Sequence, residues 1–151
     1  MSDINALYQE MILDHNKNPR NFGQPEGYTH FAEGYNPLCG DHINIYVKLE
    51  DGVIRDIHFS GKGCAISKSS ASIMTEVLKG KSIPDAKKAF SGFQQLVTAP
   101  MDESPDLASL GKLAVFAGVK EFPSRIKCAS LAWHTMVSAI EGTVEKSVST
   151  E

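Results

Sequence analysis

The sequence lacks several features, and each absence excludes a class of protein. It contains no apolar run long enough to span a membrane, and no internal repeat. Positive charge is not in excess, because the net charge is −3, so the electrostatic footprint of a nucleic-acid-binding protein is missing. No basic leader opens the chain either. We therefore expect a cytoplasmic protein with neither a membrane nor a nucleic acid as its partner.

Cysteine is also scarce. Only Cys39, Cys64 and Cys128 occur in 151 residues, and a small odd set in a reducing compartment points away from a disulfide framework. Together with the carboxylate of Asp41, three thiolates instead form a complete four-ligand set for zinc or iron–sulfur chemistry. Taken singly, Cys128 reads better as a small core residue and Asp41 as a turn cap. A set in which all four residues have such unrelated structural roles is much less plausible than one such role alone, so the four together favour a metal site.

Alternating apolar residues predict a β-hairpin at 43–59, with the turn at Asp51 and Gly52. A strict two-residue register would place Asp56 on the core face. We therefore expect a one-residue slip, through a bulge or a three-residue loop, that sets Val47 opposite Ile57. A third strand is expected near 28–34.

The remainder reads as helices. Apolar spacing and capping signals predict helices that begin near residues 2, 65, 82, 104 and 123. Strands followed by helices indicate one α+β domain over 1–151, a three-stranded antiparallel sheet with helices packed on it. Residues 143–151 are expected to be a flexible tail.

The hairpin register brings part of the ligand set together. It places Asp41 opposite Gly63, so Cys39, Asp41 and Cys64 gather at the open end of the hairpin. Cys128 follows a predicted helix start, where the helix dipole stabilises a thiolate. The sequence pattern alone does not bring that helix to the same place.

Other polar residues receive plainer interpretations. Four histidines are expected in surface or turn positions, namely His15, His30, His42 and His58. His134 lies six residues after Cys128 on one predicted helix, about 120° out of register, so the two do not form a thiol-protease pair. Trp133 is expected in the core or on a partner surface.

The segments that carry the cysteines resemble a known family. NPLCGD at 36–41, GKGCAIS at 61–67 and KCASLAW at 127–133 are similar to the three signature blocks of the NifU/IscU amino-terminal-domain family. The start of the chain, with ILDH at 12–15 and NPRN at 18–21, is also similar. The resemblance implies a SufE/NifU-like fold with a metal site at one end of the sheet. It also implies that Cys39, Asp41, Cys64 and Cys128 are the metal or cluster ligands.

Within the family the chain resembles the SufU branch. An apparent insertion at 100–122 lengthens the region between the second and third cysteines, and Lys127 stands where the scaffold branch has histidine. EFPSR at 121–125 replaces the chaperone-docking segment LPPVK of that branch. The SufU resemblance implies a zinc-bound sulfur acceptor, a sulfur carrier rather than a stand-alone enzyme. It would take persulfide sulfur from a pyridoxal-phosphate-dependent, SufS-like cysteine desulfurase and supply a downstream cluster-assembly scaffold.

In that interpretation Cys39 is the acceptor thiolate, released from zinc when a desulfurase histidine replaces it. Arg125 and Lys127 would offset the negative charge of the site or contact the desulfurase, although both also fit as solvated residues at a helix start. One alternative is a scaffold for an iron or [2Fe–2S] centre on the same four residues, with Asp41 the labile ligand. A second is a zinc-stabilised interaction domain without sulfur chemistry.

Overall fold

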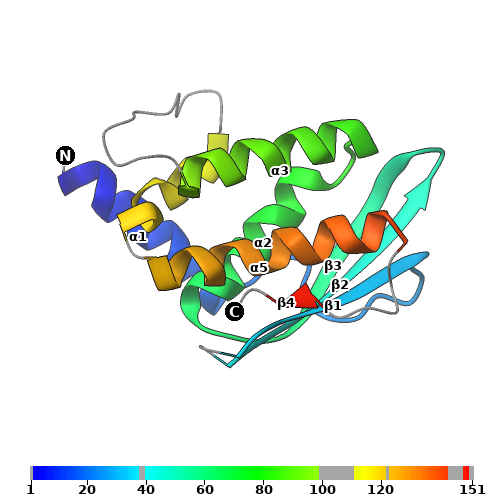
Figure 1. The fold of residues 1–151 in the computed structure, drawn as a ribbon, viewed down its shortest axis with the longest axis horizontal. Helices are drawn as coiled ribbons and strands as arrows, with labels where there is room; N and C mark the ends of the chain where they lie inside the picture. The colour runs from blue at the N-terminus through cyan, green and yellow to red at the C-terminus, as the bar shows by residue number, and fades with distance from the viewer. Residues whose placement is uncertain (1, 38–39, 99–110, 122, 143–147, 150–151) are drawn as a thin grey trace.

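The protein has two layers, a β-sheet and a set of helices over one of its faces (Figure 1). The computed structural model describes residues 2–37, 40–98, 111–121, 123–142 and 148–149. The elements in chain order are α1 (Ser2–Lys17), β1 (His30–Asn36), β2 (Asp41–Glu50), β3 (Val53–Lys62), α2 (Ala65–Leu78), α3 (Ile83–Thr98), the 3₁₀ helix η1 (Gly111–Glu121), α5 (Pro123–Ile140) and β4 (Val148–Ser149). No helix among these described residues combines the length and the apolar character needed to cross a membrane.

The sheet confirms the predicted antiparallel arrangement of three strands. Its order is β3-β2-β1-β4, in which β1–β2 and β2–β3 are antiparallel pairs. The short strand β4 was not predicted, and it pairs in parallel with β1 through Gly34 and Val148. Residues 143–147 and 150–151 of the expected tail lie outside the described residues.

The predicted slip in the hairpin is present. Val47 pairs with Ile57, and the register shifts between Lys48 and Leu49. Asp51 and Gly52 form a tight turn in which both φ angles are positive, at 53° and 75°. The slip therefore comes from a bulge inside β3 and not from a longer loop, and it keeps the apolar residues of both strands on the covered face.

The helices α1, α2, α3 and α5 confirm four of the expected starts. At the start of α3, the Ser82 side chain caps the helix by accepting a hydrogen bond of 3.2 Å from the Asp85 N–H. The helix predicted from residue 104 falls largely on 99–110, outside the described residues. The part of the apparent insertion that is described, η1, buries Leu113, Phe116 and Val119 in the core.

Helix α5 lies directly against β1 and β2. The two elements are in close contact at Gly34, where a Cβ atom would lie 2.1 Å from Thr135 Oγ1 and 2.9 Å from Leu131 Cδ1. Only glycine permits this contact. Trp133, on the same helix, is fully buried and stacks on Phe93 with ring centroids 4.8 Å apart, so it is a core residue.

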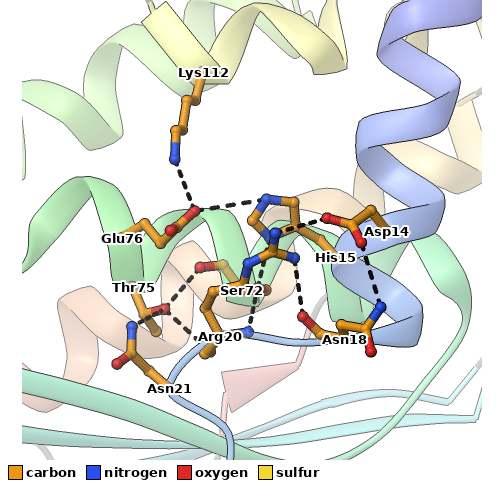
Figure 2. A network of polar contacts seen from close by, with 9 residues as sticks. All are labelled: Asp14, His15, Asn18, Arg20, Asn21, Ser72, Thr75, Glu76 and Lys112. Atoms are coloured by element: carbon orange, nitrogen blue, oxygen red, sulfur yellow. Dashed lines mark hydrogen bonds and ion pairs between the residues drawn. The ribbon is translucent and has the colours of Figure 1, made fainter.

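A polar network around the buried His15 joins the end of α1 to α2 and η1 (Figure 2). His15 Nδ1 lies 2.7 Å from Ser72 Oγ, and His15 Nε2 lies 3.6 Å from Glu76 Oε1. Lys112 of η1 donates to the same Glu76 oxygen at 2.9 Å. The expectation of a surface position is wrong for His15, which is 3 % exposed, because the polar face of α2 supplies partners that allow an imidazole to be buried.

Candidate metal centre

Three elements that are far apart in the sequence meet at one end of the sheet. Asp41 is the first residue of β2, Cys64 is the N-cap of α2, and Cys128 lies in the second turn of α5. One carboxylate oxygen and the two Sγ atoms lie within 4.8 Å of one another. The structure thus brings Cys128 to the hairpin end, which the sequence pattern alone did not do.

Hydrogen bonds fix the carboxylate of Asp41 inside this cluster. Its Oδ1 accepts from the backbone N–H of Cys64 at 2.9 Å, and its Oδ2 accepts from Asn36 Nδ2 at 3.3 Å. Asp41 is 2 % exposed and forms no ion pair with any residue that the structure describes. The donors that the structure describes for this buried carboxylate, the Asn36 amide and the Cys64 N–H, are neutral, and a cation would complete such an environment.

The structure corrects which cysteine sits at a helix start. Cys64 caps α2, and its Sγ accepts a hydrogen bond of 3.4 Å from the Ser67 N–H, so the positive end of that helix dipole faces this sulfur. Cys128 was expected to follow its helix start closely and, taken singly, to be a small core residue. It lies in the second turn of α5, past the free N–H groups of the first turn, and it is 2 % exposed, as the core interpretation predicts.

Two glycines bring the strand end close to the ligands. A Cβ atom on Gly63 would lie 2.8 Å from Asp41 Oδ1 and 3.0 Å from Ser67 Oγ. Gly61 has a φ of +114°, and a Cβ atom there would lie 2.0 Å from the carbonyl oxygen of His42. The GKG sequence at 61–63 therefore serves close packing around Asp41.

Asn36 was missed by the sequence analysis. It is fully buried at the end of β1, and its Nδ2 also donates to Cys128 Sγ at 3.5 Å. An asparagine before a proline reads as a turn residue, and the pattern gives no signal that it faces a thiol of α5.

The structure describes some, but not all, of the other residues that the sequence analysis assigned to the site. Cys39 lies outside the described residues, two positions before Asp41 in the sequence. Arg125 is exposed and Lys127 partly buried near the start of α5. His42 pairs with Glu33 at 3.0 Å and stacks on Tyr35, so it does not belong to the ligand cluster of the described residues.

The three described donors fit a tetrahedral thiolate site. Ligand atoms at about 2.3 Å from one tetrahedral ion lie roughly 3.8 Å apart. The spacing of 4.8 Å or less among Asp41, Cys64 and Cys128 needs only a small contraction to reach that value. Soft sulfur donors favour zinc or iron–sulfur centres over magnesium or calcium.

The fold and the cluster together define a class of protein: an α+β domain that carries a thiolate–carboxylate site at one end of its sheet. A profile of the NifU-like N terminal domain matches residues 7–129. The chain belongs to this family, which serves iron–sulfur cluster assembly through its IscU and SufU members.

Individual relatives cover nearly all of the chain. The Streptococcus pyogenes serotype M1 protein named iron-sulfur cluster assembly scaffold protein IscU is 40% identical, over 93% of this chain and 87% of its own length. The Bacillus subtilis (strain 168) protein named zinc-dependent sulfurtransferase SufU is 37% identical, over 92% of each chain. A solved structure from Fervidobacterium islandicum AW-1, described as a putative iron-sulfur cluster assembly scaffold protein for the SUF system, superposes with a TM-score of 0.80 at 32% identity, covering 89% of this chain and 97% of that one.

Proposed function

We propose that this protein is a zinc-dependent sulfur acceptor in iron–sulfur cluster assembly. The observation that carries the proposal is the convergence of Asp41, Cys64 and Cys128 on one point from three distant segments. The name of the Bacillus subtilis relative supports the same role, as do Lys127 and the apparent insertion at 100–122.

Zinc would be held by Asp41, Cys64 and Cys128 together with Cys39. When bound, the ion would neutralise the negative charge of the thiolates and protect them from oxidation and disulfide exchange. Because Asp41 and Cys128 are buried and hydrogen-bonded, they suit holding positions. The resemblance to the SufU branch assigns Cys39 as the ligand that leaves the ion and accepts sulfur.

The sulfur step conserves electrons. The Cys39 thiolate attacks the terminal sulfur of a cysteine persulfide on the desulfurase, a new sulfur–sulfur bond forms, and the bond within the donor persulfide breaks. The desulfurase cysteine leaves as a thiolate, and Cys39 carries the persulfide. The partner is a pyridoxal-phosphate-dependent, SufS-like cysteine desulfurase in the cytoplasm, and a downstream cluster-assembly scaffold receives the sulfur.

Arg125 and Lys127 are proposed to contact this partner or to offset the charge of the site. Both belong to the first two turns of α5, on the helix that contributes Cys128. Replacing either by alanine should weaken stimulation of the desulfurase without removing zinc.

The decisive experiment measures desulfurase turnover with the wild-type protein and with Cys39→Ala. Wild type should bind about one zinc ion per chain and stimulate turnover, whereas Cys39→Ala should not stimulate it. Undiminished stimulation by Cys39→Ala would remove the acceptor role. A protein that loses its fold on chelation yet never affects a desulfurase would instead be a zinc-stabilised interaction domain.

A second candidate function is a scaffold that assembles and transfers a [2Fe–2S] cluster on the same four residues. The relatives named IscU favour it, at 40% identity in Streptococcus pyogenes serotype M1 and 36% in Thermotoga maritima. Anaerobic reconstitution, followed by transfer to an apo-ferredoxin, separates the two functions. Iron and sulfide that pass to the acceptor support the scaffold, and tightly held zinc without any cluster transfer supports the sulfur acceptor.

A further inference from the structure

Asn36 joins two of the candidate ligands that come from different parts of the chain. It ends β1 directly opposite Asp41 in the β1–β2 register, and it is fully buried. Its Nδ2 lies 3.3 Å from Asp41 Oδ2 and 3.5 Å from Cys128 Sγ. A carboxamide nitrogen carries two hydrogens, so it has one donor for each of these acceptors.

The orientation of this carboxamide follows from its neighbours. Asn36 Oδ1 has no hydrogen-bond partner among the described residues. Rotating the amide by 180° would turn that oxygen toward the Asp41 carboxylate and the Cys128 sulfur, and the two N–H groups away from both. Because both neighbours are acceptors, only the observed orientation is favourable. Both N–H groups are thus directed at the cluster, while the buried carbonyl oxygen is left without a partner among the residues that the structure describes.

We propose that Asn36 is a positioning residue of the metal centre, which fixes Asp41 and Cys128 in the geometry that binds the ion. The inference rests on the proposed function, and it extends that function to a residue that is not itself a ligand. Asn36 connects Cys128 to Asp41, and the Cys64 N–H connects Asp41 to α2. These bonds link the three described ligands before any ion arrives, which is the form of preorganisation that outer hydrogen bonds give to metal sites.

The N–H···S contact has a further chemical effect. A hydrogen bond to a metal-bound sulfur withdraws electron density from it and lowers its nucleophilicity. Asn36 therefore keeps Cys128 as a holding ligand and leaves sulfur acceptance to another cysteine.

The first experiment compares zinc affinity in wild type, Asn36→Ala and the control Asn44→Ala, by competition with a chromophoric chelator. Asn44 is on β2 and donates to Ser60 Oγ at 3.2 Å, away from the cluster. We expect Asn36→Ala to weaken zinc binding by about 10–100-fold. The control should bind zinc as wild type does. Cobalt(II) substitution should show an altered sulfur-to-metal charge-transfer band in Asn36→Ala alone.

A purely structural role for Asn36 predicts a different result. It would lower the melting temperature but leave both the zinc dissociation constant and the cobalt(II) spectrum at their wild-type values. That outcome would overturn the proposal.

The second experiment needs no variant, and it therefore remains decisive if Asn36→Ala does not fold. In ¹⁵N-labelled wild type loaded with ¹¹³Cd, the Asn36 side-chain protons should exchange slowly and show scalar coupling to the metal through Cys128 Sγ. Rapidly exchanging Asn36 protons without coupling would overturn the proposal while leaving the proposed function intact. Failure of wild type to bind zinc or cadmium would instead overturn the proposed function and this inference with it.

Discussion

The backbone N–H of Cys64 donates a hydrogen bond of 2.9 Å to Oδ1 of Asp41, which joins the N-cap of α2 directly to the first residue of β2. The two residues are 23 positions apart in the sequence. Any change that moves one of them should therefore move the other, and the candidate metal site should respond to substitutions that touch neither residue.

Gly63→Ala is the sharpest such substitution. Its Cβ would lie 2.8 Å from Asp41 Oδ1, so the carboxylate must move. We expect zinc affinity to fall by about 10-fold or more, as for other changes that displace a ligand through its surroundings. Gly27→Ala is the matched control, because no atom lies within 4 Å of its added Cβ. Equal zinc dissociation constants for the two variants, from chelator competition, would contradict the expectation.

Gly34→Ala should separate α5 from β1. The added Cβ would lie 2.1 Å from Thr135 Oγ1, and overpacking of this kind costs about 1–3 kcal/mol of unfolding free energy. Urea denaturation measures the loss. Adding Thr135→Ala removes the clashing oxygen and should restore part of the stability. Strictly additive effects of the two substitutions would show that this contact does not set the helix position.

Phe116→Ala tests whether η1 belongs to the core. Phe116 is fully buried, and its ring lies 5.8 Å from that of Phe93 in an edge-to-face arrangement. Its truncation should cost about 3–5 kcal/mol in chemical denaturation. Lys112→Ala, on the same element but in a largely exposed ion pair with Glu76, should cost no more than about 1 kcal/mol. Similarly small losses of unfolding free energy in both variants would mean that η1 is not an integral part of the core.

Thiol reactivity should follow exposure. In zinc-free protein, Cys64 is partly exposed and Cys128 is 2 % exposed, so iodoacetamide should modify Cys64 first. Zinc should protect both sulfurs, because a coordinated thiolate is not free to react. Peptide mass spectrometry after timed quenching measures the two rates. Faster labelling of Cys128 than of Cys64 would contradict the arrangement described above.

Stability should fall as the solution becomes acidic. Burial lowers the pKa of His15 from its ordinary value of 6.5, Arg20 lowers it further, and Glu76 acts in the opposite direction. Burial also lowers the pKa of His134. Below pH 6.5 the unfolded chain takes up protons more readily than the folded protein does, so the free energy of unfolding decreases as pH falls through the folded pKa.

The contribution of His15 can be isolated. In zinc-free protein, His15→Gln should be less stable than wild type at pH 7.5 and should lose less stability between pH 7.5 and 5.5. One such histidine changes the slope by at most about 1.4 kcal/mol per pH unit. His30→Gln, at the start of β1, is the control. An unchanged slope in His15→Gln would assign the acid sensitivity elsewhere.

Local sequence patterns predicted the parts of the fold that local chemistry determines. The alternation of apolar residues such as Val47 and Ile57 with polar residues was enough to predict the one-residue slip in the hairpin register. The capping residue Ser82 likewise predicted the start of α3. The candidate ligand set was proposed from the cysteine count and the family resemblance, and the structure brings three of its four members together. What brings Cys128 to Asp41 is the close contact at Gly34, a long-range packing relationship that has no local signature.

The polar face of α2 shows a second limit of predicting burial from sequence patterns. Ser67, Ser70 and Ser72 are fully buried, although serines on a helix usually indicate a solvated face. The hydroxyl groups of Ser70 and Ser72 have partners elsewhere in the chain. Ser70 Oγ donates to the Ala129 carbonyl at 2.6 Å, and Ser72 Oγ meets His15. Burial of such residues depends on tertiary partners that no window of sequence contains.

The order of the elements along the chain has a consequence for biosynthesis. Asp41 and Cys64 emerge early from the ribosome, while Cys128 belongs to α5, the last helix of the described chain. The cluster cannot be complete until α5 has emerged and docked across Gly34. Nascent chains should therefore expose two thiols before they can form the site, and stable metal loading has to follow the synthesis and docking of α5.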